Sequence, residues 1–388
     1  MSAFESNKKT IYFISHSTYP VANTGGGSIV LYRHLKRLEK DGYKIVFIHS
    51  IQNPPSTSKT EFEEILIKRR KWYPPLRPHT PLLTNVRISF YFKYLKKLIK
   101  PKPGDLILST FGDYTNLLAL KLSVRFKLPL FMIYHDDNLF NTYFNENLLS
   151  KPAVKKIIRQ TKHFFAVSEP MKDLLLQNGA SSVSVLYPIP DGYTGKKKAW
   201  TDTYTSDSSF YNSGAIFEDF HSGLIQNIAN AAEKARINIS LLGRLSSTFK
   251  KRLEQFHSLR IGGRVEKTED LFKQLIIKAD VLLVFYSFEP NKEQRLFHSF
   301  PSKFAEYSHL GIPILIIAPS YSAIGKWAIK NNWYSYLSTD NVEDLYKIMI
   351  RFRDEYFWEA CHRQSLQVAQ DFFDPDKIHL QFVETLLN

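Results

Sequence analysis

The sequence predicts an α/β protein made of two doubly wound, Rossmann-like domains with parallel sheets. The chain has 388 residues, which favours two domains of roughly 150 to 200 residues over a single core. Short apolar runs alternate with helical stretches in both halves, as expected for strands covered by helices on both faces. A polar stretch, "IPDGYTGKKKAWTDTYTSDSS", separates the two halves.

The first domain is expected over residues 1–190 and the second over 210–365, joined by a linker at 191–209. In the first half a helix is expected from about Ser28 to Lys40, and the candidate strands are 10–16, 43–50, 105–110, 128–135, 163–168 and 183–188. In the second half they are 213–217, 237–243, 259–263, 280–286, 312–319 and 334–338. A final helix at 366–388 is expected to return toward the first domain. Ligands of such sheets bind at the carboxyl ends of the strands, so we expect the two domains to face a ligand cleft.

The composition is that of a globular protein in a reducing compartment. The chain is 44% hydrophobic and 23% charged, and its single cysteine excludes an internal disulfide. The beginning, "MSAFESNKKT", has no apolar signal-peptide core. The longest apolar runs, such as "VLLVFY" and "IPILIIAP", are far shorter than the ~20 residues that cross a bilayer. We therefore expect a cytoplasmic protein.

The net charge of +15 is concentrated in one segment of the first half. Residues 68–102 contain eleven Lys or Arg and no Asp or Glu, interleaved with aromatic and aliphatic residues. Such a segment suits an anionic membrane surface or the acceptor, with candidate contacts at Lys68, Arg69, Arg70, Lys71, Trp72, Lys93, Lys96 and Lys97. Electrostatic binding of nucleic acid and a solvated basic face without a partner remain alternatives.

Polar residues and glycines follow two strands of the first half. His135, Asp136 and Asp137 come after the apolar run "FMIY", where an imidazole and two carboxylates can bind sugar hydroxyls, act as a base or bind a metal. A helix cap with a surface acid is the alternative. In the turn "GGGS", Gly26 and Gly27 allow backbone amides to approach an anion, unless the turn is purely structural.

Three glycine turns follow strands of the second half. Gly214 and Gly243 permit close approach of a phosphate, and Arg244 adds a guanidinium suited to bidentate contact. The third turn, "GGRV", contains Gly263, Arg264 and Val265.

The segment "FPSKFAEYSHLGIPILIIAP" (300–319) places a cation and a carboxylate in one short helix. Ser302 is expected to cap the helix, with Lys303 in the first turn and Glu306 about one turn later. A nucleoside diphosphate fits this set, with the diphosphate at Lys303 and Ser302 and the ribose hydroxyls at Glu306. An exposed Lys–Glu pair is the alternative.

The second half resembles the nucleotide-sugar domain of GT-B glycosyltransferases, in particular the family 4 or group 1 enzymes related to glycogen synthase. "PSKFAEYSHLGIPIL" is similar to the family segment P-x-K-x-x-E-Y-x-x-x-G-x-P-V. The resemblance implies that Glu306 binds the ribose, that Lys303 binds the diphosphate, that Gly263, Arg264 and Val265 border the nucleobase, and that His135 faces the donor sugar.

Two positions depart from the family pattern. His298 stands where the family often has a glutamate that contacts the donor sugar. The donor-sugar region is therefore expected at His298 and Phe300. Ala215 follows Gly214 where the family often has arginine, a charge that Arg244 partly replaces. Such changes resemble a subgroup of bacterial surface-polysaccharide enzymes.

The expected activity is transfer of a hexose from a nucleoside diphosphate sugar, with UDP favoured, to a hydroxyl of a lipid-linked saccharide or polysaccharide. We expect a retaining reaction without metal or prosthetic group, by an enzyme at the inner face of the cell membrane. An inverting transferase with Asp136 or Asp137 as base is one alternative. Others are a metal-dependent transferase, a nucleotide-sugar epimerase, a DNA-modifying glycosyltransferase and a non-catalytic protein that binds nucleic acid or sugar. No recognised DNA-binding motif is present, so we do not expect a nucleic-acid partner.

Overall fold

The computed structural model of the chain is an α/β fold that divides into two compact units. The first unit is Met1–Leu186 with His379–Asn388, and the second is Tyr187–Ile378. The structure describes residues 8–16, 18–22, 26–50, 60–67, 81–136, 149–203, 209–214, 216, 218–243, 245–265, 267–289 and 294–387.

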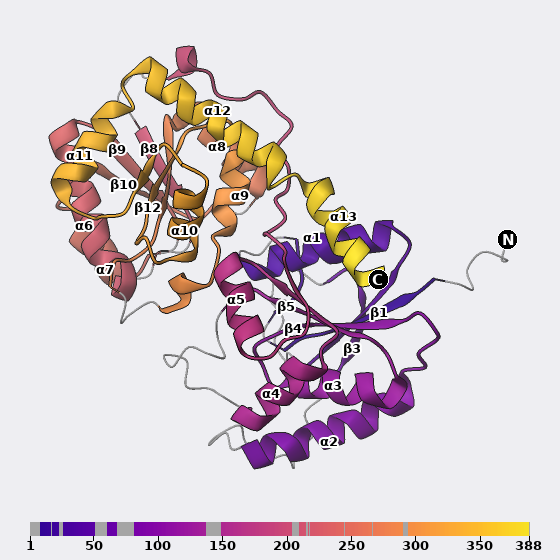
Figure 1. The fold of residues 1–388 in the computed structure, drawn as a ribbon. Coiled ribbons are helices and arrows are strands. Elements are labelled where there is room, and N and C mark those ends of the chain that lie inside the picture. Colours follow the sequence, from indigo (N-terminus) through magenta and orange to yellow (C-terminus); the bar gives the residue numbers. More distant parts are fainter. Residues whose placement is uncertain are drawn as a thin grey trace. The chain divides into compact units, whose positions relative to one another are not determined.

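The first unit contains a seven-stranded parallel sheet in the order β3-β2-β1-β4-β5-β6-β7 (Figure 1). Its strands are β1 (Thr10–Ile14), β2 (Lys44–His49), β3 (Glu63–Leu66), β4 (Leu106–Thr110), β5 (Leu130–Tyr134), β6 (His163–Ala166) and β7 (Val183–Val185). Its helices are α1 (Gly27–Lys40), α2 (Pro81–Leu98), α3 (Thr115–Phe126), α4 (Lys151–Gln160) and α5 (Glu169–Gln177). Figure 1 shows α1 on one face of this sheet and α3 on the other.

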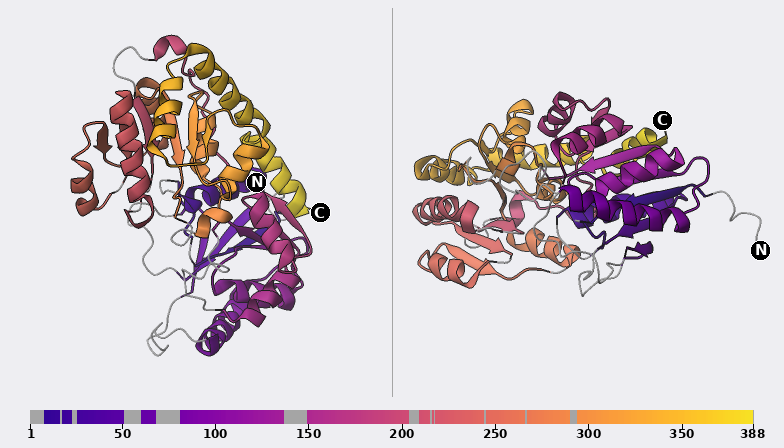
Figure 2. Two further views of the ribbon diagram at one scale, coloured as in Figure 1. Left: turned by 60° about the vertical axis from the view of Figure 1, so that its left-hand side comes forward. Right: turned by 90° about the horizontal axis from the view of Figure 1, so that it is seen from below.

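The second unit contains a six-stranded parallel sheet in the order β10-β9-β8-β11-β12-β13. Its strands are β8 (Ser209–Ser213), β9 (Asn238–Leu242), β10 (Leu259–Gly262), β11 (Val281–Phe285), β12 (Ile314–Ile317) and β13 (Tyr336–Leu337). Its helices are α6 (Glu218–Ala235), α7 (Ser247–Leu253), α8 (Thr268–Lys278), α9 (Ser302–Ser308), α10 (Ala323–Lys330), α11 (Val342–Arg351) and α12 (Glu355–Asp371), with 3₁₀ turns at Trp200–Asp202 and Gln294–Phe297. The left view of Figure 2 shows α6 on one side of this sheet and α12 on the other. The last helix, α13 (Pro375–Leu387), contains the division between the units.

The two-sheet α/β fold predicted from the alternating pattern is confirmed, whereas the first strand of the second half was placed wrongly. The expected strand at 213–217 is β8 at Ser209–Ser213. Gly214, at φ +119°, leaves the strand in a conformation that other residues rarely adopt. The sequence analysis also missed β3, an edge strand that begins with two exposed glutamates and lacks the apolar run of a central strand.

Polar side chains fix where several helices begin. Ser150, Ser168, Ser246 and Ser322 each accept a hydrogen bond from a backbone N–H of the first turn of the following helix. Such caps satisfy N–H groups that have no partner within the helix. These four helices therefore start at positions set by the local sequence.

Both cores consist of strands covered on both faces. All five residues of β5 and of β11 are buried, as expected for central strands of a doubly wound sheet. In the first unit the end of α13 completes the core, because Phe382 is fully buried and its ring lies 4.9 Å from His34 and 4.7 Å from Phe165. Nε2 of His379 on the same helix lies 2.6 Å from Oδ2 of Asp41, within hydrogen-bond distance.

Replacing Phe382 with alanine is expected to lower the unfolding free energy of the first unit by about 3 to 5 kcal/mol, because a buried aromatic side chain is lost. Urea unfolding followed by circular dichroism measures the change. Leu380→Ala is the matched control on the same helix, since Leu380 is 58% exposed. Equal effects of the two substitutions would contradict the packing role of Phe382.

Candidate functional site

Three glycine turns lie side by side at the carboxyl edge of the second sheet. Gly214 follows β8, Gly243 follows β9, and Gly262 ends the neighbouring β10. The Gly214 amide donates to the carbonyl of Leu242 at 2.7 Å. A Cβ on Gly243 would lie 2.0 Å from the carbonyl oxygen of Gly214, so this turn requires glycine. The edge thus presents closely packed backbone, which can approach a phosphate closely.

Lys303 of α9 extends over the first of these turns. A Cβ on Gly214 would lie 2.3 Å from Cε and 2.7 Å from Nζ of Lys303, so the lysine occupies the space that the missing side chain leaves. Burial lowers the pKa of Lys303 to about 8. Among the described residues, no carboxylate forms an ion pair with it. A desolvated ammonium without a counter-ion favours an anionic ligand, which would restore its ordinary pKa.

Two further side chains of α9 fix its position. The Tyr307 hydroxyl is buried, accepts a hydrogen bond from the Ser213 amide at 2.8 Å and lies 2.9 Å from the Ser213 hydroxyl. It thereby joins the helix to the strand end that precedes Gly214. The carboxylate of Glu306 accepts a hydrogen bond from the Asp191 amide at 3.2 Å. Sequence reasoning missed Tyr307, although it follows Glu306 directly.

Ser302 does not cap α9, contrary to the sequence-based expectation. Pro301 occupies the N-cap position and offers no side-chain acceptor, while Ser302 is the first helical residue. The helix has only seven residues. The positive charge at this edge therefore comes mainly from Lys303.

The positions assigned to the donor sugar and nucleobase differ in exposure. Phe300 is buried, with its ring 6.1 Å from Phe304 and 5.1 Å from Tyr187, so it packs in an aromatic cluster. His298 is half-buried. Gly263 and Arg264 are exposed after β10 and Val265 is half-buried, while Arg244 lies outside the described residues.

In the first unit, His135 and Asp136 follow β5 as predicted, and Asp137 lies outside the described residues. The Nε2 atom of His135 is buried and has no hydrogen-bond partner among the described residues. Burial lowers the pKa of His135 to about 4, although Asp136 opposes this shift. The imidazole is therefore neutral at pH 7. Asp136 is exposed.

Gly26 and Gly27 open α1 with accessible backbone. Gly26 has φ +65°, and a Cβ at either glycine would meet no atom within 4 Å. No side chain caps α1, and its first turn carries no acidic residue. Its first N–H groups can therefore interact with an anion.

Within the described ranges, no three or more His, Cys, Asp or Glu side chains lie together in a way that could hold a metal ion. In the same ranges, no helix is long and apolar enough to cross a membrane. Of the basic segment, Lys93, Lys96 and Lys97 are exposed on α2, whereas Lys68, Arg69, Arg70, Lys71 and Trp72 lie outside the described residues.

A family model matches the first part of the chain. The model described as Glycosyltransferase Family 4 covers residues 24–191. This segment is therefore similar to the domains of that family. No curated protein sequence matches the chain.

Solved glycosyltransferase structures match nearly the whole chain. The lipopolysaccharide outer core galactosyltransferase WaaB has 16% identity and a TM-score of 0.66, covering 97% of this chain and 99% of its own. Anabaena HepE, solved in complex with UDP, has 14% identity and a TM-score of 0.68 with the same coverage. The α,α-trehalose 6-phosphate synthase of Burkholderia multivorans has 12% identity and a TM-score of 0.65, covering 97% of this chain and 98% of its own. Together with the family match, these structures confirm the resemblance and the GT-B fold predicted from the sequence.

Replacing Gly214 with alanine is expected to destabilise the second unit by about 1 to 3 kcal/mol, because alanine is strained at this φ and its Cβ displaces Lys303. Gly223→Ala is the control, since a Cβ there meets no atom within 4 Å in helix α6, and it should stabilise by about 0.5 to 1 kcal/mol. Chemical unfolding followed by tryptophan fluorescence compares the two variants. A neutral effect of Gly214→Ala would contradict the close packing of the turn.

Proposed function

We propose that this protein transfers a hexose from a nucleoside diphosphate sugar, with UDP favoured, to a hydroxyl of a lipid-linked saccharide or polysaccharide. The observation that carries the proposal is the desolvated Lys303 over Gly214, beside two further glycine turns. Anabaena HepE, which shares the fold, was solved with UDP and with UDP-glucose. The relatives WaaB and WaaG are enzymes of lipopolysaccharide synthesis by their descriptions, which supports a saccharide acceptor.

In this proposal the second unit binds the donor. Lys303 and the backbone amides of the glycine turns bind the diphosphate, with Ser302 and Gly214 beside it. Arg244, the guanidinium assigned to the diphosphate from the sequence, lies outside the described residues. Glu306 binds the ribose hydroxyls, as its position one turn after Lys303 allows. As the bond between sugar and phosphate breaks, negative charge develops on the diphosphate, and a fixed ammonium stabilises it without reorganisation. No metal is needed for this role.

The first unit is proposed to bind the acceptor and to contribute His135 toward the sugar. Because His135 is neutral, it can hydrogen-bond a sugar hydroxyl without introducing charge. We favour a retaining reaction in which an oxygen of the donor phosphate assists. If the reaction inverts, Asp136 is the exposed carboxylate suited to act as base.

A panel of UDP, GDP, ADP, TDP and CMP with their sugar conjugates tests the donor site. We expect UDP to raise the melting temperature, and Lys303→Gln and Glu306→Ala to weaken UDP binding by about tenfold to a hundredfold, since each removes a hydrogen bond that involves a charged group. Glu269→Ala, an exposed glutamate on α8, is the control. Absence of a response to every nucleotide would contradict the proposal.

The affinity for UDP should also fall as the pH rises from 7 to 9. Lys303 has a pKa of about 8 in the ligand-free protein, and the diphosphate binds its protonated form, so binding above this pKa requires uptake of a proton. Titration calorimetry at both pH values measures the change. Lys303→Gln should show a much flatter dependence, and an equal slope in wild type and variant would assign the effect to another group.

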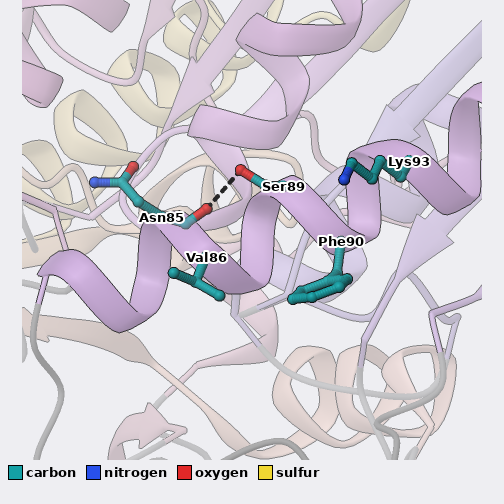
Figure 3. A pocket seen from close by; sticks show the side chains of 5 residues that line it. All are labelled: Asn85, Val86, Ser89, Phe90 and Lys93. Carbon is teal, nitrogen blue, oxygen red and sulfur yellow. Dashed lines mark hydrogen bonds between the residues drawn. The ribbon is translucent and has the colours of Figure 1, made fainter.

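We propose that the protein acts at the inner surface of the cell membrane and that the exposed face of α2 contacts the lipids. Val86, Phe90, Tyr94 and Leu98 recur every four residues and are 37 to 48% exposed. Three exposed lysines of the same helix lie beside them, namely Lys93, Lys96 and Lys97. The opposite face of α2 packs against α3. Figure 3 shows Val86 and Phe90 on this helix with Asn85, Ser89 and Lys93, which together line a surface pocket. Apolar residues flanked by lysines suit an anionic lipid interface.

Flotation with anionic vesicles that contain phosphatidylglycerol tests the membrane contact. The wild type should float with them and remain at the bottom with neutral phosphatidylcholine vesicles. The double substitution Phe90→Ser and Tyr94→Ser should abolish flotation, whereas Val124→Ser, at a 63% exposed position on α3, should not. Sedimentation of the wild type in all conditions would contradict membrane association.

A further inference from the structure

Four polar side chains meet at the carboxyl edge of the first sheet, where β2, β1 and β4 lie next to one another. His16 follows β1, Ser50 follows β2, and Asp113 and Tyr114 follow β4. The Ser50 hydroxyl lies 2.8 Å from Nδ1 of His16 and 2.7 Å from the Tyr114 hydroxyl. The three side chains therefore form one hydrogen-bonded chain.

The position of His16 is fixed by both its backbone and its ring. Its amide donates to Oδ2 of Asp113 at 3.2 Å, and the other carboxylate oxygen of Asp113 accepts from the Thr115 amide at 2.7 Å. The imidazole ring lies 4.8 Å from the ring of Tyr114. With Nδ1 bonded to Ser50, the remaining polar atom of the ring is Nε2, for which the described residues supply no partner.

A second histidine of the same sheet shows how a purely structural imidazole is satisfied. His163 of β6 has Nδ1 2.8 Å from Ser182 and Nε2 2.8 Å from Ser184, so both nitrogens are bonded. His16 has one bonded nitrogen and is held at the edge where doubly wound sheets bind ligands. His16 therefore keeps one ring nitrogen with which a bound ligand can form a hydrogen bond.

The charges around His16 favour the neutral imidazole. Burial lowers its pKa, Asp113 opposes this shift, and Arg87 of α2 adds to it. His49 of β2 also interacts electrostatically with His16, and burial lowers its pKa too, while burial raises the pKa of the Tyr114 hydroxyl. If the Nδ1 proton is directed to Ser50, Nε2 is a hydrogen-bond acceptor, and if Ser50 donates to Nδ1, Nε2 is a donor; a hydroxyl group suits both.

We propose that Nε2 of His16 binds the saccharide hydroxyl that accepts the transferred sugar, with Ser50 and Tyr114 as positioning residues. The inference rests on the proposed function and names the acceptor subsite of the first unit. The ligand class is a sugar hydroxyl, because a hydroxyl group can donate to the neutral Nε2 or accept from it, whichever tautomer the ring adopts.

Two amide substitutions at His16 distinguish the roles of its nitrogens. In His16→Gln, the amide group of the introduced side chain reaches the position of Nε2. In His16→Asn, the shorter side chain places its amide group only at the position of Nδ1. Transfer from UDP-sugars to a panel of octyl glycosides is measured for both, together with UDP affinity and hydrolysis of the donor by water. His16→Asn should raise the KM for the glycoside about tenfold or more, with UDP affinity unchanged. His16→Gln should have a KM for the glycoside much closer to that of the wild type.

Ser50→Ala tests the positioning role and should lower kcat/KM for the glycoside several-fold, again without changing UDP affinity. Equal activity of His16→Asn and wild type would overturn the proposal, as would failure of every octyl glycoside while the wild-type enzyme still hydrolyses the donor. Loss of UDP binding or donor hydrolysis in the wild type would instead contradict the donor site. Circular dichroism of each variant separates unfolding from loss of the contact.

Discussion

The ammonium group of Lys303 lies over a glycine turn, and much of the second unit depends on this contact. A side chain at Gly214 would occupy the same space as Lys303, and a side chain at Gly243 would collide with the carbonyl of Gly214. Tyr307 holds the strand end and the helix together through Ser213. The ammonium group of Lys303 is poorly solvated, and no described residue supplies a counter-ion. Burying an unpaired charge in this way costs free energy of folding. An anionic ligand would compensate that cost.

The sequence predicted the second half of this arrangement well because its signals are local. Strand, glycine turn and helix follow one another within a few residues, so Lys303, Glu306 and the three turns could be found without knowing the packing. The placement of β8 was wrong because "SFYNS" has little apolar content and lies next to a polar stretch. The capping role of Ser302 was wrong because a shift of one residue at a helix start decides which side chain accepts.

The first unit was harder to interpret because its site is assembled from distant segments. The same rule that drew attention to His135 and Asp136 applies to "SHS" after β1 and to Ser50 after β2, since these residues also follow apolar strands. What the sequence could not supply was the strand order, which places β2 and β4 on either side of β1. Only this order brings Ser50 and Tyr114, 64 residues apart, within hydrogen-bond distance.

The packing of Phe382 against His34 and Phe165 has a consequence for how the protein is made. The first unit is synthesised early, yet a fully buried part of its core is supplied by the last residues of the chain. On the ribosome its seven strands can pair before the second unit exists, but the apolar surface that Phe382 covers stays uncovered until the whole second unit has been synthesised. Closing so long a loop is slow and leaves apolar surface exposed to other chains meanwhile. The unit that is begun first is therefore completed only after the second unit has been made.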